Sequence, residues 1–154
     1  MEIALLAVGR LRPYYREACD DYLRRLTRYA RVTEHEVKEA ARAATLERQR
    51  ADEAAALASR RPPASTLVCL AREGSPWTSE DLARRLDRWR LEARPVALAI
   101  GGSNGLSPEL LAGADSVWSL GPLTLPHELA RVVVAEQLYR AFTILRGEPY
   151  HKGR

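Results

Sequence analysis

The 154-residue chain lacks long apolar runs and has only two cysteines. Cys19 and Cys69 occur without a CxxC spacing or neighbouring histidines, so we expect reduced thiols and no zinc or other metal. The apolar start, residues 1–9, has no basic segment before it and is far shorter than the roughly 20 residues that span a bilayer. We therefore expect a cytoplasmic protein without a membrane segment.

A strong excess of one charge is also missing, since 24 basic and 20 acidic residues give a formal net charge of +4. Any attraction to nucleic acid must then come from local clusters of cations. The hydrophobic share of 46% and charged share of 29% are ordinary for a globular protein. The length suits one hydrophobic core rather than two, so we expect a single domain over residues 1–154.

Short apolar runs alternate with amphipathic segments along the whole chain. The apolar runs predict buried strands at 2–8, 32–37, 66–71, 96–100 and 116–120. Apolar residues spaced three and four apart, or strong helix formers, predict helices at 14–29, 40–60, 79–92, after Ser107 and at 126–145, with a turn at 74–76. This alternation predicts an α/β fold with a mostly parallel sheet flanked by helices.

The last helix, 126–145, differs from the others because apolar side chains cover well over half of its circumference. A helix that lies on one face of a sheet would not need so many. Two interpretations remain open, a helix that also contacts a partner subunit and a helix at the centre of the protein's own core.

Two loops are candidates for a ligand site, because ligands of open α/β sheets bind beyond the carboxyl ends of the strands. The loop 100–105 holds three glycines but has neither a P-loop ending nor a dinucleotide-binding spacing, so it is a ligand loop or a tight turn. The loop 120–127 is apolar and suits a flat ring such as adenine, or it is a buried connector. His127 is expected to cap or pack at the start of the last helix.

The C-terminal segment interleaves basic and aromatic residues. Arg146, Lys152 and Arg154 alternate with Tyr150 and His151, a pattern that can pair with phosphates and stack on an unpaired base. Short basic C-termini are also often frayed, so both interpretations stay open at this point.

Five ordered segments together resemble a known family. They are IGGSNGL (100–106), WSL (118–120), LTLPH (123–127), RVVVAEQLYRAF (131–142) and PYHK (149–152). This set is similar to the bacterial large-subunit ribosomal RNA pseudouridine N3-methyltransferases of the SPOUT superfamily, and the similarity extends over the whole chain. The resemblance implies a C-terminal trefoil knot, a homodimer formed through the last helix, and a 23S rRNA substrate within the large subunit or the 70S ribosome.

The resemblance also implies S-adenosylmethionine as cofactor. Its contacts would be Leu70, Gly101, Leu120, Gly121, Pro122, Leu123, Thr124 and Leu125. The alternative is a binding module for RNA or the ribosome that keeps the fold without catalysis.

The tail supplies the candidate catalytic residues. As a hypothesis, Tyr150 and His151 position or deprotonate the target base, because the imide N3 must lose its proton before it attacks the methyl group. Arg140 would stabilise the developing negative charge, or it forms a simple helix pair with Glu136. The residues expected to bind RNA are Arg131, Lys152 and Arg154.

Overall fold

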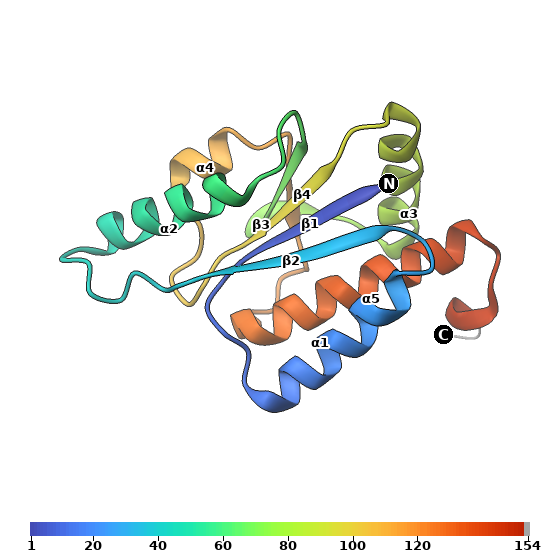
Figure 1. The fold of residues 1–154 in the computed structure, drawn as a ribbon, viewed down its shortest axis with the longest axis horizontal. Helices are drawn as coiled ribbons and strands as arrows, with labels where there is room; N and C mark the ends of the chain where they lie inside the picture. Colours follow the sequence, from blue (N-terminus) through green and yellow to red (C-terminus); the bar gives the residue numbers. More distant parts are fainter. Residues whose placement is uncertain (153–154) are drawn as a thin grey trace.

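Five parallel strands form one sheet with helices on both faces in the computed structural model, which describes residues 1–152 (Figure 1). The strands are β1 (Glu2–Val8), β2 (Arg31–Val37), β3 (Thr66–Pro76), β4 (Val96–Ile100) and β5 (Ser116–Ser119), in the order β2-β1-β4-β3-β5. The helices are α1 (Pro13–Leu26), α2 (Leu46–Arg60), α3 (Ser79–Glu92), α4 (Pro108–Ala112), α5 (His127–Leu145) and the 3-10 turn η1 (Pro149–His151). The predicted α/β class with a parallel sheet is confirmed.

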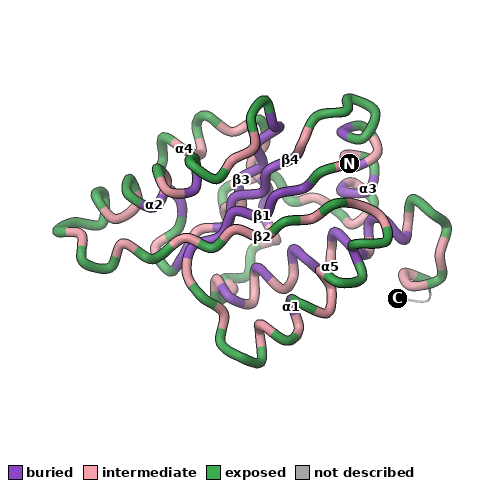
Figure 2. The backbone as a smooth tube through the Cα atoms, in the orientation of Figure 1, coloured by how far each residue is buried: buried purple, intermediate pink, exposed green. Residues whose placement is uncertain are grey.

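The sheet separates two hydrophobic cores, because successive side chains of a strand point to opposite faces. In β1, Ile3 and Leu5 belong to the larger core, which α1, α3 and α5 cover, whereas Ala4 and Leu6 belong to the smaller one beneath α2 and α4. Figure 2 shows that buried residues concentrate in the central strands. This two-sided burial explains the continuous apolar runs of the sequence.

The sequence predicts most elements closely and misplaces two boundaries. β4 and α3 have the predicted bounds, and Thr78 closes a capping box with Asp81 at the start of α3. Helix α2 begins at residue 46 rather than 40, because the Thr45 side chain accepts a hydrogen bond from the Arg48 amide and caps the helix there.

The turn predicted at residues 74–76 is wrong, because β3 continues through it and pairs again with β5 after an irregularity between Leu70 and Ser75. Gly74 allows β3 to come close to β5 and does not reverse the direction of the chain. A Cβ atom there would lie 2.5 Å from the carbonyl oxygen of Val117, so only glycine lets the two strands come so near.

All five strands point the same way, so their carboxyl ends meet at one edge of the sheet. The loops that leave this edge include residues 9–12 after β1, 101–107 after β4 and 120–126 after β5. The two candidate ligand loops of the sequence therefore lie at the same edge. Within residues 1–152, no helix has the length and apolarity needed to cross a membrane.

Candidate functional site

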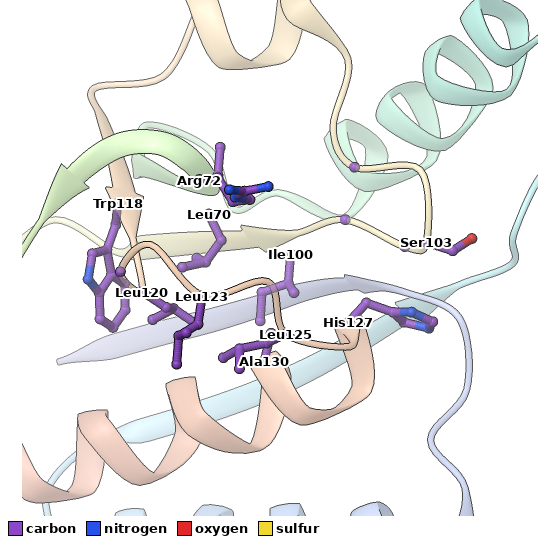
Figure 3. Close-up of a pocket in the computed structure, with 15 residues that line it drawn as sticks. Leu70, Arg72, Ile100, Ser103, Trp118, Leu120, Leu123, Leu125, His127 and Ala130 are labelled. Carbon is purple, nitrogen blue, oxygen red and sulfur yellow. The ribbon is translucent and has the colours of Figure 1, made fainter.

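A pocket of about 250 Å³ opens at the carboxyl ends of β3, β4 and β5 (Figure 3). Its volume is close to the lower end of the range for small-molecule sites. Six of the eight predicted cofactor contacts line it, namely Leu70, Gly101, Leu120, Gly121, Leu123 and Leu125. Pro122 and Thr124 belong to the same loop but are not among the lining residues. The structure thus brings together residues as far apart in the sequence as Leu70 and Leu125.

The glycine loop after β4 is both a tight turn and a wall of this pocket. A Cβ atom on Gly101 would lie 2.7 Å from the carbonyl carbon of Gly105, which leaves no space for a side chain. The Gly105 amide donates to the Gly102 carbonyl oxygen at 3.1 Å and closes the turn. From α2, Arg50 Nε donates to the Asn104 carbonyl oxygen at 2.7 Å and holds the loop from outside. The sequence left open whether this loop is a tight turn or part of a ligand site, and in the structure the tight turn also lines the pocket.

The loop after β5 forms the apolar wall. Gly121 has a φ of +112°, a conformation that L side chains rarely adopt. Ser119 Oγ accepts a hydrogen bond from the Gly121 amide at 3.1 Å and donates one to its carbonyl oxygen at 3.2 Å, which fixes the bend. Leu123 is 74% exposed and stands at the rim beside Leu125 (Figure 3). An exposed leucine at the mouth of a pocket is suited to cover an apolar ligand.

The first turn of α5 completes the pocket through His127 and Ala130. The imidazole also packs against the end of β1, because a Cβ atom on Gly9 would lie 3.7 Å from His127 Nε2. No hydrogen bond from the His127 side chain occurs within residues 1–152. Of the two roles expected for His127, the structure shows packing.

Comparison with known proteins identifies the family. A family model described as a predicted SPOUT methyltransferase matches residues 1–151. The chain belongs to the SPOUT methyltransferase family. It is 44% identical to the Ribosomal RNA large subunit methyltransferase H of Pseudomonas aeruginosa strain PAO1, over 99% of this chain and 100% of that protein. It is 43% identical to the protein of the same name from Pseudomonas putida strain KT2440, with the same coverage.

Two solved structures show the same fold at low sequence identity. A probable methylase family protein from Haemophilus influenzae Rd KW20 aligns with a TM-score of 0.58 and 13% identity, over 98% of this chain and 70% of that one. A probable methyltransferase from Bordetella pertussis Tohama I aligns with a TM-score of 0.53 and 19% identity, over 91% and 95%. The SPOUT fold is therefore confirmed, and family membership implies the trefoil knot.

Arg131 of this SPOUT methyltransferase is a buried residue, which argues against the prediction that it binds RNA. Its side chain is 1% exposed. The guanidinium pairs with Glu34 at 3.1 Å and with Glu36, and Nη2 donates to the Gly9 carbonyl oxygen at 2.8 Å. Nη1 and Nη2 are thus used inside the protein, and Nε, which has no partner within residues 1–152, is buried as well, so none of these donors faces a phosphate outside. Arg131 instead fixes the end of β1 against α5.

The tail does not lie beside the pocket in one protomer, contrary to the sequence-based hypothesis. The pocket contacts the first turn of α5, whereas η1 follows the last turn of that helix (Figure 1), and its Tyr150 contacts Glu136 and Tyr139 of α5. None of the tail residues Tyr150, His151 and Lys152 is among the residues that line the pocket. Arg154 lies outside the described residues.

Arg140 and Tyr150 share one carboxylate. Arg140 Nη2 donates to Glu136 Oε1 at 2.6 Å, which is the helix pair considered from the sequence. The Tyr150 hydroxyl donates to the same oxygen at 3.0 Å. Burial, together with hydrogen bonding, raises the pKa of Tyr150 well above its ordinary value. In this arrangement the hydroxyl of Tyr150 is a hydrogen-bond donor and not a proton acceptor.

His151 is half-buried, and its Nδ1 atom has no hydrogen-bond partner within residues 1–152. It neighbours Tyr150 in η1, and Lys152 after it is exposed. This nitrogen is itself shielded from solvent, so another molecule reaches it only if the tail moves. His151 is therefore a tail residue with an unused hydrogen-bonding atom.

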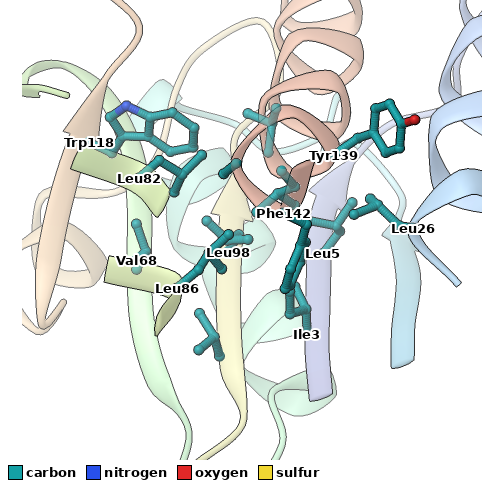
Figure 4. Packing of buried hydrophobic residues seen from close by; sticks show 14 of the residues in the cluster. Ile3, Leu5, Leu26, Val68, Leu82, Leu86, Leu98, Trp118, Tyr139 and Phe142 are labelled. Carbon is teal, nitrogen blue, oxygen red and sulfur yellow. The ribbon is translucent and has the colours of Figure 1, made fainter. Parts of the chain in front are cut away.

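Much of the apolar surface of α5 is covered within the protomer. The helix packs against both α1 and α3, and Tyr139 and Phe142 lie in the larger core (Figure 4). Leu129, Val132 and Val133 remain half-buried, and Leu145 is exposed. The central position of α5 thus accounts for most of its apolar residues, and the remainder is available to a partner.

Two further residues, Arg72 and Trp118, line the pocket although neither was predicted as a site residue, and Trp118 entered the sequence analysis only as part of the WSL segment. Arg72 follows the apolar run of β3 directly, and cations placed just after a buried strand are the signal that could have identified it. Trp118 stacks on Trp77 with ring centroids 5.2 Å apart and closes the inner end of the pocket. Among the described residues, no group of three or more His, Cys, Asp or Glu could hold a metal ion.

Proposed function

We propose that this protein transfers a methyl group from S-adenosylmethionine to N3 of a pseudouridine in 23S rRNA of the large ribosomal subunit. The observation that carries the proposal is the pocket at the carboxyl edge, which six of the eight expected cofactor contacts line. The 43–44% identity, over 99% of this chain, to proteins named Ribosomal RNA large subunit methyltransferase H supports the substrate class.

The pocket fits S-adenosylmethionine better than a nucleotide with phosphates. Leu120, Leu123 and Leu125 enclose a flat apolar space, and the neighbouring loops offer backbone amides and carbonyls to a heteroaromatic ring. When bound, the cofactor would supply an electrophilic methyl group on a positively charged sulfur. The backbone loops fixed by Gly101 and Ser119 hold such a ligand in one orientation, which is the main contribution that positioning makes to a transfer reaction.

The tail completes the proposed site from a second copy of the chain. Within one protomer, Tyr150 and His151 lie towards the opposite end of α5 from the pocket. In a homodimer with α5 helices side by side and antiparallel, the tail of one copy would reach the pocket of the other. The half-buried apolar residues Leu129, Val132 and Val133 are available for that contact.

The roles of the tail residues follow from their hydrogen bonds. Tyr150 stays protonated and donates, so it would orient a carbonyl oxygen of the target base. His151 Nδ1 is unpaired but buried, so it would accept the proton that N3 loses once the tail opens towards the base. Arg140 would release Glu136 and stabilise the negative charge that develops on the base. Lys152 and Arg154 would pair with phosphates of the RNA backbone.

The decisive experiment maps the methyl group on ribosomal RNA. Purified protein, S-adenosylmethionine and either 70S ribosomes, isolated large subunits or free 23S rRNA are combined, and the RNA is digested and analysed by mass spectrometry. We expect one methyl group on one pseudouridine, with ribosomes as substrate and the cytoplasm as the place of action. Transfer to another base, or none to any of the three substrates, would overturn the proposal.

Stoichiometric binding of S-adenosylmethionine in calorimetry separates this enzyme from a non-catalytic module of the same fold. The module would bind ribosomes but not the cofactor. We expect one cofactor per occupied site with micromolar affinity, a range ordinary for enzyme ligands.

A further inference from the structure

Exposed cations gather around the mouth of the pocket. Arg72 lines the pocket from within β3, and Arg10 lies in the loop after β1. Both side chains are exposed, and neither forms an ion pair within residues 1–152. Exposed arginines on the helices are often neutralised, as Arg48 is by Asp52 and Arg88 by Glu92. No carboxylate within residues 1–152 forms an ion pair with Arg10 or Arg72, so both guanidinium groups are available to an external anion.

Arg10 and Arg72 lie on two sides of the pocket mouth. Arg10 follows Gly9, which packs against His127 of the pocket wall, 3.7 Å from a Cβ atom built on the glycine to Nε2. The next residues are anchored to the same helix, since the Arg12 amide donates to Glu128 Oε1 at 3.1 Å. Arg72 stands across the pocket on β3, above Leu70 (Figure 3).

An exposed aromatic ring accompanies the cations on the β1 side. Tyr14 is 58% exposed, in the first turn of α1. Arg12 Nη1 donates to its hydroxyl at 3.1 Å and holds the ring next to the basic loop. Alternating guanidinium groups and exposed rings bind single-stranded nucleic acids, because phosphates pair with the cations and bases stack on the rings.

We propose that this surface, defined by Arg10, Tyr14 and Arg72 and here called the edge surface, binds the single-stranded RNA backbone on both sides of the target nucleotide. The inference rests on the proposed function and adds where the RNA lies. A base that reaches the cofactor at the pocket mouth must leave its stack, so the flanking phosphates are drawn to the pocket mouth. Arg72 would hold the backbone on one side and Arg10 on the other, while a flanking base stacks on Tyr14.

The test compares Arg10→Gln, Arg72→Gln and the double variant with wild type. We expect the KM for ribosomes to rise about five- to tenfold for each single change, with kcat within about twofold, because the lost contacts position RNA without touching the reacting atoms. The slope of log affinity for a labelled single-stranded 23S rRNA fragment against log salt should fall by about 0.7 for each arginine. Tyr14→Leu should weaken that affinity by about five- to tenfold without changing the slope.

Arg60→Gln is the matched control. Arg60 is also exposed and without an ion pair within residues 1–152, but it ends α2, just before the chain enters β3 at the opposite edge of the sheet. The control should behave as wild type in both assays. An equal loss of affinity in Arg60→Gln would show a general charge effect and overturn the edge surface.

Two further measurements decide between the edge surface and its rivals. Calorimetry with S-adenosylhomocysteine should give wild-type affinity in every variant, and weaker binding in Arg72→Gln would assign that residue to the cofactor instead. Light scattering should show an unchanged oligomeric state, and dissociation would assign the surface to a contact between copies. Wild-type KM and salt slope in the double variant would also overturn the inference. Because the RNA-fragment assay needs no methyl transfer, it tests the edge surface even if the proposed reaction fails.

Discussion

Gly101 shows how one residue determines the shape of the pocket. Its missing side chain allows the chain to pass within 2.7 Å, measured from a Cβ atom built on the glycine to the Gly105 carbonyl carbon. In Gly101→Ala the loop must shift, so we expect calorimetry to show that the affinity for S-adenosylhomocysteine falls at least about tenfold.

Gly113→Ala provides the comparison for this prediction. A Cβ atom on Gly113 would meet its nearest neighbour, the Glu109 carbonyl oxygen, at 3.5 Å, an ordinary contact. The variant should bind S-adenosylhomocysteine as wild type does. Unchanged affinity in Gly101→Ala would mean that the loop adapts and does not shape the site.

Arg131 is a buried cation that holds two carboxylates and a backbone carbonyl oxygen together. Arg131→Met leaves Glu34, Glu36 and the Gly9 carbonyl oxygen without their common donor. We expect urea unfolding to show a loss of about 3 kcal/mol, the order of magnitude for breaking a buried pair.

Arg16→Met is the matched variant for Arg131, because Arg16 pairs with the same two carboxylates from a side chain that is 29% exposed. Its cost should be lower, at about 1 kcal/mol, because water can replace a partly exposed cation. A stable Arg131→Met protein with weakened ribosome binding would instead support a role of Arg131 in RNA binding, which its burial argues against.

At the scale of elements, a single hydrogen bond ties the turn after α1 to the segment that precedes η1. The Tyr29 hydroxyl donates to Glu148 Oε2 at 2.6 Å, and burial raises the pKa of Tyr29 from its ordinary value of 10.0 to about 12. The unfolded chain releases this proton at lower pH than the folded chain does. The stabilisation is therefore complete below pH 10 and is lost as the pH rises towards about 12.

Tyr29→Phe tests this linkage. The free energy of unfolding should fall less steeply between pH 10 and 12 in the variant than in wild type, measured by urea titration at several pH values. Other tyrosines titrate in both proteins, so the difference between the two curves isolates Tyr29. Parallel curves would show that the hydroxyl does not couple the tail to the turn.

For the whole molecule, the separation of tail and pocket along α5 makes the proposed site a property of two chains. Gly101→Ala would damage the pocket, and His151→Ala would damage the tail. When the two inactive proteins are mixed, unfolded and refolded together, half of the dimers are mixed, and each mixed dimer has one site with an intact pocket and an intact tail. We expect about a quarter of wild-type methyl transfer to return.

Each variant refolded alone is the control for this mixing experiment and should stay inactive. If the mixture also stays inactive while native mass spectrometry confirms mixed dimers, each chain completes its own site. The tail would then have to move to the pocket of its own protomer.

The accuracy of the sequence-based predictions depended on how local the decisive interactions are. β4, α3 and the Ser107 cap of α4 were predicted correctly, because burial on both faces and capping side chains act within a few residues. The turn at 74–76 was mispredicted, because Gly74 is needed there for close contact with Val117, which is more than forty residues away in the sequence. The burial of Arg131 was missed for the same reason, since its partners Glu34 and Glu36 belong to a strand distant in the sequence.

The sequence by itself determined the α/β class, the order of the elements and the two loops that form the pocket. Periodicity, glycines and capping residues act on the few residues around them, so they can be recognised without the tertiary structure. Only the tertiary structure decided which charged side chains are free. Ion pairing and burial depend on which strands become neighbours, and this neighbourhood buried Arg131 between β1 and β2 while it left Arg10 and Arg72 exposed at the pocket. The position of the tail was also decided there, because folding places it towards the opposite end of α5 from the site it was expected to serve.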